Sequence, residues 1–272
     1  MLRTTSRRAG VLAVAAALAL TAAGCAKKDA GGTTASGVST VKAGQLTTCT
    51  HLPYAPFQFK DARDKIVGFD VDLIDLVAKR LKVKQAIIDT PFEGIKSGQD
   101  LATNKCDIAA AGMTINAERK KAIDFSDPYF DATQAMLVKT GAPYKSLADL
   151  KGKKVGGQAA TTGLDYLKAN AQANGYEIVE YKDLATEQQA LATGRIDAAV
   201  NDLPVWAEFI KENPGKYAVS AQFNTGEQYG FGLKKGGNPE LLKVVNEALA
   251  QAKQDGTYDA LYKKWIGTAP AQ

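Results

Sequence analysis

A small set of polar, charged and aromatic residues directly follows short apolar runs of the chain. In the first half, the set comprises His51, Tyr54, Phe92, Gly112, Thr114 and Arg119. In the second half, it comprises Gln158, Thr162, Asn201 and Asp202. An Arg binds a carboxylate through two parallel hydrogen bonds, an Asp accepts from an ammonium group, and aromatic faces enclose an aliphatic chain. The set therefore predicts a site for a small zwitterion.

The start of a helix in the second half adds a further group for a carboxylate. Thr162-Gly163-Leu164-Asp165 has the form of a capping box, with a Thr followed three positions later by an acid. Free N–H groups in the first turn of a helix bind anions. We therefore expect Thr162 and its neighbours to contact the ligand carboxylate.

Each of these residues also has a purely structural explanation. Arg119 lies in a charged run that would ordinarily be solvated, and Asp202 precedes Pro204 as a helix cap does. Tyr54 and Phe92 belong to residue types that often fill a core. Their shared position at predicted strand ends favours a binding site, because ligands lie beyond the carboxyl ends of parallel strands.

The chain shows no pattern typical of a catalytic or metal centre. His51 is the only histidine, so zinc-ligand spacings are missing and no nucleophile has a His partner. Gly156-Gly157-Gln158 is too short for a phosphate-binding loop. Asp124 and Asp127 could form an acid–base pair, but Asp127 precedes Pro128 as in a turn. We expect no cofactor and no metal.

Residues 1–24 have the form of an export signal. Three Arg residues precede an apolar run from Val11 to Leu20, which is too short to span a membrane. Leu20-Thr21-Ala22-Ala23-Gly24-Cys25 resembles a bacterial lipobox, in which the cysteine is lipidated and becomes the new N-terminus. The alternative is an ordinary secretory signal cleaved near Gly24. The first interpretation predicts a protein on the outer face of the cytoplasmic membrane, attached only through lipid on Cys25.

Residues 25–44 are rich in Gly, Ala, Thr and Ser, and they predict a lipid-anchored flexible tether. Removal of residues 1–24 takes away three Arg, so the formal net charge falls from +5 to +2. That charge excludes a nucleic-acid-binding protein, which requires a concentrated basic patch. Two cysteines remain, Cys49 and Cys106. In an exported chain they are expected to form a disulfide, with two separate buried thiols as the alternative.

Strand and helix patterns alternate along the rest of the chain. Expected strands cover residues 45–50, 85–89, 107–111, 134–139, 154–157, 176–181 and 196–201, with an extended stretch at 227–233. Expected helices cover residues 71–82, 162–174, 186–192, 239–253 and 257–265. Asp70 is the expected N-cap of the first helix. This alternation predicts an α/β protein with mostly parallel sheets, in two blocks at 45–133 and 134–230.

Four segments resemble motifs of the extracellular solute-binding protein family 3, the amino-acid receptors of ATP-binding-cassette importers. They are GFDVDLIDLVA at 68–78, TINAERKKAIDFSDPY at 114–129, QYG at 228–230 and DGTYDALYKKW at 255–265. The resemblance covers residues 45–268. It implies a type II periplasmic-binding-protein fold, with lobe 1 at 45–133 plus 231–272 and lobe 2 at 134–230. Hinge strands are expected near 132–137 and 226–231.

The resemblance also implies a role for each ligand residue. Arg119 matches the carboxylate-binding Arg, Thr162 the carboxylate contact of the second lobe, and Asp202 the ammonium-binding acid. Thr114 matches a hydroxyl ligand and Gly112 the residue whose carbonyl takes the ammonium. Tyr54 and Phe92 match an aromatic pair. The chain departs from the family at His51, where receptors for basic amino acids often carry an acid, and in a slightly longer loop at 96–105.

The residues left for the ligand side chain are Tyr54, Phe92, His51, Gln158 and Asn201. None is a carboxylate or a permanent cation, and the two amides offer both donors and acceptors. We therefore expect glutamine or another polar neutral amino acid, with glutamate second and basic amino acids third. The expected partner is the importer's permease, and the protein is expected to be a monomer. The alternatives are an enzyme like cyclohexadienyl dehydratase and a surface adhesin or sensor partner on the same fold.

Overall fold

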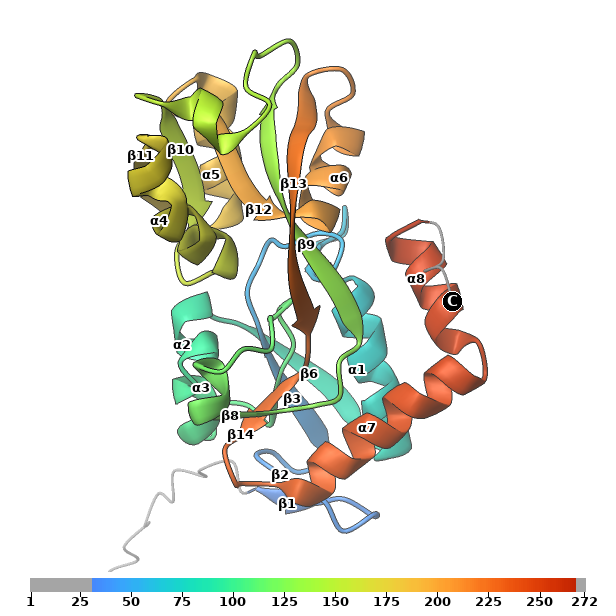
Figure 1. The fold of residues 1–272 in the computed structure, drawn as a ribbon. Helices are drawn as coiled ribbons and strands as arrows, with labels where there is room; N and C mark the ends of the chain where they lie inside the picture. Colours follow the sequence, from blue (N-terminus) through green and yellow to red (C-terminus); the bar gives the residue numbers. More distant parts are fainter. Residues whose placement is uncertain (1–30, 268–272) are drawn as a thin grey trace, which may run out of the picture.

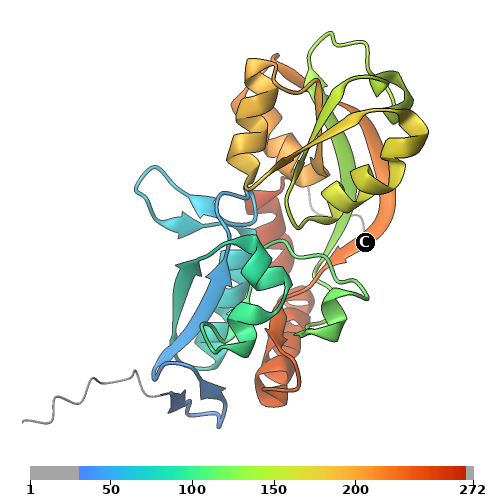
Figure 2. The same ribbon diagram turned by 90° about the vertical axis from the view of Figure 1, so that its left-hand side faces the viewer.

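The computed structural model describes residues 31–267, which form two α/β lobes connected by two long strands (Figure 1). The connecting strands are β9 (Phe130–Lys139) and β13 (Tyr217–Tyr229), which pair antiparallel. Figure 2 shows them passing together from one lobe to the other. The predicted two-lobe α/β fold with two hinge strands is confirmed.

Lobe 1, the lower lobe in Figure 1, contains a five-stranded sheet in the order β6-β3-β7-β14-β8. Its strands are β3 (Gln45–Thr50), β6 (Lys84–Asp89), β7 (Ile108–Ala109), β8 (Ile123–Phe125) and β14 (Gly232–Lys234). A small separate sheet pairs β4 (Phe59–Lys60) with β5 (Ile66–Val67). The helices are α1 (Phe69–Arg80), α2 (Phe92–Lys96), α3 (Gln99–Ala102), α7 (Pro239–Gln254) and α8 (Thr257–Trp265). Helix α1 buries an apolar stripe and packs against α7 and α8.

Lobe 2 contains a second five-stranded sheet in the order β11-β10-β12-β9-β13, so both hinge strands belong to it. Its remaining strands are β10 (Lys154–Gln158), β11 (Glu177–Tyr181) and β12 (Ala198–Asp202). Its helices are α4 (Thr162–Asn174), α5 (Leu184–Thr193) and α6 (Leu203–Glu212). Helices α4 and α5 each end at a left-handed glycine, Gly175 and Gly194, as helix C-caps commonly do.

Both sheets are mixed rather than mostly parallel. In lobe 1, β3 pairs parallel with β6 and β7, whereas β14 pairs antiparallel with β7 and β8. In lobe 2, β10 pairs parallel with β11 and β12, whereas β9 pairs antiparallel with β12 and β13. The parallel pairs belong to strand–helix–strand units, and the antiparallel pairs arise where the chain passes between the lobes and returns.

Three local predictions differ from the structure. Helix α1 begins at Phe69 after Gly68, so the prediction of Asp70 as its N-cap is wrong; that carboxylate binds other groups in the interior. Helix α6 was not predicted, although a helix cap at Asp202 before Pro204 was considered. Asp202 is its N-cap, and Pro204 lies in its first turn, where proline is favoured. The third difference concerns the tether.

Residues 31–44 pack on lobe 1 instead of forming the C-terminal part of a tether. They contain the hairpin of β1 (Gly32–Thr33) and β2 (Ser39–Thr40). Val38 is buried in the core, and the Val41 N–H donates to Asp107 Oδ1 at 2.6 Å. One apolar side chain and a few hydrogen bonds thus hold a segment of low overall hydrophobicity. The export signal, Cys25 and the rest of the expected tether lie outside the described residues.

Within residues 31–267, no helix combines the length and the apolar composition needed to cross a membrane.

Candidate ligand-binding site

A small cavity lies between the two lobes. Lobe 1 lines it with His51, Tyr54, Gln58, Phe92, Ala111, Gly112, Thr114 and Arg119. Lobe 2 lines it with Gln158, Thr161, Thr162 and Asp202. Most of these residues follow the carboxyl ends of β3, β7, β10 and β12, where ligands of α/β sheets bind. Of the ten predicted ligand residues, nine line this cavity, and Asn201 does not.

Arg119 is almost fully buried at one side of the cavity. Its Nη1 donates to Thr114 O at 2.9 Å in lobe 1, and its Nη2 donates to Ala160 O at 3.1 Å in lobe 2. Its Cζ lies 5.5 Å from the centre of the Phe92 ring, in a cation–π contact. Burial lowers the pKa of Arg119, and the charge of Asp202 opposes this shift. A guanidinium has five N–H donors, so groups remain for a carboxylate.

Asp202 is a buried carboxylate at the end of β12. Its Oδ2 accepts from Tyr54 OH at 2.5 Å and from Tyr229 OH, and its Oδ1 accepts from Gln134 Nε2. Burial raises the pKa of Asp202 to about 6, and the tyrosine hydrogen bonds oppose that rise. Burial and the charge of Asp202 raise the pKa of Tyr54 and Tyr229 well above the usual value, so both remain protonated donors.

The backbone N–H of Gly112 is bound by Asp70, a buried carboxylate of the family motif at 68–78. Asp70 Oδ2 accepts from Gly112 N at 2.9 Å, and Asp70 Oδ1 accepts from Tyr129 OH at 2.7 Å. Gly112 has a φ of 54°, and a Cβ atom there would lie 2.9 Å from the Tyr54 ring. Only glycine fits this position without strain, because the backbone is left-handed and approaches the ring closely. Asp70 thereby holds the loop that leads to Thr114.

The start of α4 differs in one detail from the prediction. The N-cap is Thr161, whose Oγ1 accepts from Leu164 N at 3.2 Å, so the capping role predicted for Thr162 is wrong. Thr162 is the first residue of the helix, and its hydroxyl is free to donate elsewhere. Its position still places the first turn of α4 at the cavity, where free N–H groups suit a carboxylate.

Asn201 lies behind the cavity wall. Its Oδ1 accepts from Tyr54 OH at 2.9 Å, and its Nδ2 lies 3.3 Å from Glu187 Oε2 on α5 and 3.5 Å from Gln158 Oε1. The Asn201 side chain is thus held by Tyr54, Gln158 and Glu187, and it is buried. Asn201 does not line the cavity in this structure, and its expected contact with a ligand side chain stays a prediction.

The predicted set did not include several residues at or near the cavity, among them the wall residues Ala111 and Thr161. Gln58 lines it, whereas Gln134 on β9 and Glu227 on β13 join the hydrogen-bond network around Asp202 and the threonines. Gln58 lies two residues after the second proline of the loop that follows β3. A polar residue so close to the predicted site residues His51 and Tyr54 could have been included in the predicted set. The two hinge residues carried no local signal, because pairing between distant strands places them there.

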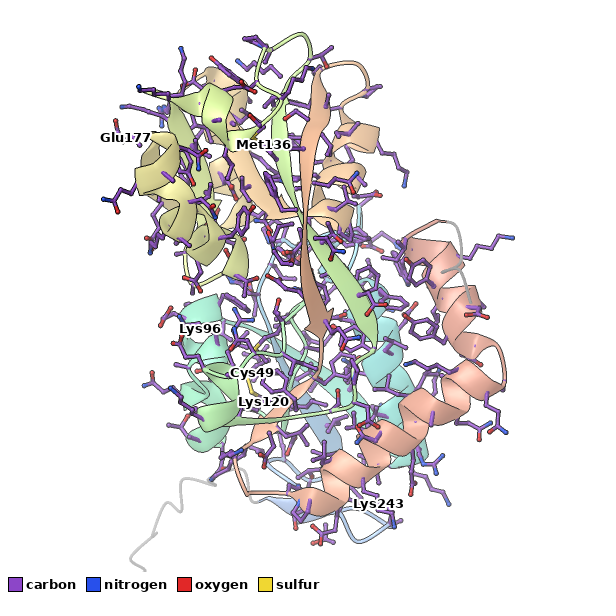
Figure 3. The ribbon with its side chains drawn as sticks, viewed as in Figure 1. Cys49, Lys96, Lys120, Met136, Glu177 and Lys243 are labelled. Atoms are coloured by element: carbon purple, nitrogen blue, oxygen red, sulfur yellow. A yellow bond between two sulfur atoms is a disulfide. The ribbon has the colours of Figure 1, made fainter. Side chains whose placement is uncertain are left out.

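The structure joins Cys49 to Cys106 in a disulfide, with Cα atoms 5.7 Å apart. Figure 3 shows this bond in lobe 1, beside the label of Cys49. Both residues pack in one cluster with Phe92 and Ile95, directly behind the cavity wall. Within residues 31–267, no group of three or more His, Cys, Asp or Glu side chains is arranged to hold a metal ion.

We expect ligand affinity to fall below pH 6 because of Asp202. The ionised carboxylate binds an ammonium group much more strongly than the neutral acid does, and burial raises the pKa of Asp202 to about 6. Protonation at lower pH therefore competes with the ligand, so affinity should be nearly constant at pH 7 and roughly tenfold weaker at pH 5. Calorimetric titrations between pH 5 and pH 7 would measure this.

The Asp202→Asn variant is the control for that pH dependence. It should bind weakly, and its affinity should not change over the same pH range. The Glu177→Gln variant changes an exposed acid of lobe 2, and it should retain the wild-type slope. A wild-type affinity that is constant from pH 5 to pH 7 would contradict the role of Asp202.

Two lobes that enclose a cavity between a buried Arg and a buried Asp define the class of two-lobe solute-binding proteins. The chain belongs to the bacterial extracellular solute-binding proteins, family 3, whose family model matches residues 46–268.

Relatives and solved structures agree with this membership. The chain is 37% identical over 216 residues to the L-cystine-binding protein TcyJ of Escherichia coli strain K12, which covers 79% of each chain. An ancestral arginine-binding protein bound to arginine superposes with a TM-score of 0.78 at 44% identity, over 82% of this chain and 99% of that one. An ancestral arginine-binding protein bound to glutamine gives a TM-score of 0.77 at 44% identity, over 82% of this chain and 98% of that one.

A further structural neighbour bears on enzymatic activity. The ancestral amino acid-binding protein AncCDT-1, a precursor of cyclohexadienyl dehydratase, superposes with a TM-score of 0.76 at 42% identity. The match covers 82% of this chain and 96% of that one. It is itself described as a binding protein, so the neighbours indicate binding more than catalysis.

Proposed function

We propose that this chain is the substrate-binding component of an ATP-binding-cassette importer and binds a polar, uncharged amino acid, with glutamine favoured. The observation that carries the proposal is the pairing of buried Arg119 with buried Asp202 across the closed cavity. An amino acid presents a carboxylate and an ammonium on one carbon, and these opposite charges match that pair. Closure around the ligand would then create the form that the permease recognises.

Two hydrogen-bond acceptors in the cavity wall support the choice of side chain. His51 Nδ1 lies 3.0 Å from Thr90 O, so in the neutral ring Nδ1 carries the proton and Nε2 is an acceptor. Gln58 Nε2 donates to His51 O at 3.3 Å, so its Oε1 is also an acceptor. Both acceptor atoms are buried and have no hydrogen-bond partner among the described residues. Buried acceptors of this kind favour a ligand with N–H groups.

These acceptors rank the possible ligands. A carboxamide donates two N–H groups without bringing a charge, whereas a glutamate carboxylate has only acceptors. Asp202 is the only carboxylate among the residues that line the cavity in the described chain, so an arginine side chain would lack a second counter-ion. Glu187 lies behind Asn201, and burial raises its pKa to about 8. We therefore place glutamine first, arginine second, and glutamate third, which exchanges the last two ranks of the sequence prediction.

Calorimetric titration of the delipidated protein with all common amino acids tests this ranking. We expect the tightest binding for glutamine. The Gln58→Glu variant, which adds a carboxylate in the same volume, should shift the preference from glutamine towards arginine. If the wild type binds arginine or lysine most tightly, the residues assigned to the ligand side chain are wrong. If it binds no amino acid, the proposed function is overturned.

We also propose that Cys25 carries lipid, which would hold the protein, as a monomer, on the outer face of the membrane near the permease. A multiply acylated cysteine binds a membrane firmly, whereas one acyl chain binds weakly. Metabolic labelling with a radioactive fatty acid should mark the wild type and not the Cys25→Ala variant. Equal labelling of both would contradict the anchor.

The proposal does not include catalysis. A dehydratase needs a general acid and a general base beside its substrate. Asp202 already accepts three hydrogen bonds and would meet the ammonium group, and Glu187 does not line the cavity. An assay for turnover of prephenate or arogenate distinguishes the two functions. Measurable turnover would show that the protein is an enzyme and that transport is not its only function.

A further inference from the structure

Glu227 of hinge strand β13 lies beside the segment around Thr114 that follows β7 in lobe 1. The backbone pairing places it there, because Ile115 N donates to Gln228 O at 2.8 Å and Thr114 forms an antiparallel bridge with Tyr229. The Thr114 side chain lines the cavity. The carboxylate that precedes this bridge is therefore within reach of a ligand-binding hydroxyl, although it does not itself line the cavity.

One carboxylate oxygen of Glu227, Oε2, accepts hydrogen bonds from both lobes and from the other hinge strand. Thr114 Oγ1 of lobe 1 donates at 3.1 Å, and Thr162 Oγ1 of lobe 2 donates at 2.8 Å. Gln134 Nε2 of β9 donates at 3.1 Å. Opening of the lobes would separate Thr114 from Thr162, so a single oxygen can hold both hydroxyls only in the closed form.

These bonds also determine the direction of the two hydroxyl groups. A threonine hydroxyl has one proton and two lone pairs. A carboxylate is the strongest acceptor near both hydroxyls, so both O–H groups point towards Glu227 and donate to it. The oxygens of Thr114 and Thr162 therefore present lone pairs to the cavity, and they accept from a ligand rather than donate to it. Arg119 and the N–H groups at the start of α4 remain as donors for a ligand carboxylate.

Gln134 connects this group to the second buried acid. Its Nε2 donates to both Glu227 Oε2 and Asp202 Oδ1, so the two amide protons lie between the two carboxylates. The Gln134 side chain is fully buried, and its Oε1 has no partner among the described residues. A buried amide with an unpaired oxygen is unfavourable by itself. The two charge-assisted bonds offset that cost, and they link Glu227 to Asp202, the acid expected to bind the ligand ammonium.

We propose that Glu227 is a positioning residue that favours the closed lobes and keeps the hydroxyls of Thr114 and Thr162 as acceptors towards the ligand. The part that concerns the ligand rests on the proposed amino-acid-binding function. The part that concerns closure does not, because the three hydrogen bonds form without a ligand.

Three variants test the role of Glu227. Glu227→Ala removes the acceptor, and glutamine, or arginine if that binds more tightly, should bind at least about tenfold more weakly, since two oriented hydrogen bonds to a charged group are lost. Glu227→Gln keeps an acceptor oxygen at the same reach and should lose less. Gln228→Ala is the matched control, because Gln228 is an exposed neighbour on the same strand that donates only to Asp131 Oδ1, at 2.7 Å.

Closure is measured in the same variants with spin labels on Lys243→Cys and Glu177→Cys. These exposed residues lie on lobe 1 and lobe 2, respectively (Figure 3). Without ligand, Glu227→Ala should shift the distance distribution towards longer values, and Gln228→Ala should match the wild type. Equal affinity and equal distances in Glu227→Ala and Gln228→Ala would overturn the proposal, as would a loss in Glu227→Gln as large as that in Glu227→Ala. If the wild type binds no amino acid, the proposed function fails, and the distances alone still decide the role of Glu227 in closure.

Discussion

Replacement of Asp202 by Ala should weaken binding of the amino-acid ligand by about 2–5 kcal/mol, or roughly thirtyfold to several thousandfold. The ligand ammonium would be buried without a counter-ion, and three donors that now bind the carboxylate would lose that acceptor. These donors are Tyr54, Tyr229 and Gln134. The dissociation constant from calorimetric titration at pH 7 measures the loss.

Replacement of Arg119 by Lys should cost at least about tenfold in affinity, although the charge is kept. A lysine ammonium is a compact point charge and cannot replace a planar fork. Arg119 uses one nitrogen to hold Thr114 O and another to hold Ala160 O, while further N–H groups face the cavity. A single ammonium cannot make these contacts and also bind a carboxylate with two parallel bonds.

An exposed acid provides the control for both variants. Glu177 lies at the surface of lobe 2, where it forms an exposed ion pair with Lys154 at 3.7 Å. Glu177→Gln changes the net charge by the same amount as Asp202→Ala but should leave affinity unchanged. Thermal unfolding of all variants verifies that the lobes remain folded. Unchanged affinity in both Asp202→Ala and Arg119→Lys would remove these residues from the site.

Elements with clear local signals could be predicted from the sequence. Strand β3 and helix α4 lie at the predicted residues, because β3 is bounded by a glycine and a histidine–proline loop, and α4 is bounded by threonines and Gly175. The location of the site was also predictable, since chemically useful residues at several strand ends meet when the strands are parallel. Helix α6 was missed although Asp202 and Pro204 stand at its start, where a cap residue and a first-turn proline are favoured.

The network around the two buried acids could not be predicted from local patterns. Gln134 and Glu227 stand in strands with no periodicity that marks them as site residues, and they meet only because β9 and β13 cross between the lobes. Asn201 and Asp202 are adjacent in the sequence, and the sequence pattern did not show which of them would face the cavity. A one-residue shift of β12 would exchange them, so their assignment depends on strand register.

Removal of the disulfide should lower the free energy of unfolding by about 2–5 kcal/mol. Cys49 and Cys106 are 57 residues apart, and closing a loop of that length restricts the unfolded chain by about 4 kcal/mol in the chain-entropy model. Both residues are buried, so the double variant Cys49→Ala/Cys106→Ala leaves a small apolar gap rather than an unpaired polar group. Urea unfolding of the double variant and the wild type measures the difference.

Ligand affinity should change less than stability, because the disulfide lies behind Phe92 and not in the cavity wall. Two free thiols in the mass spectrum of the non-reduced wild type, or equal unfolding free energies, would show that no such bond stabilises the protein.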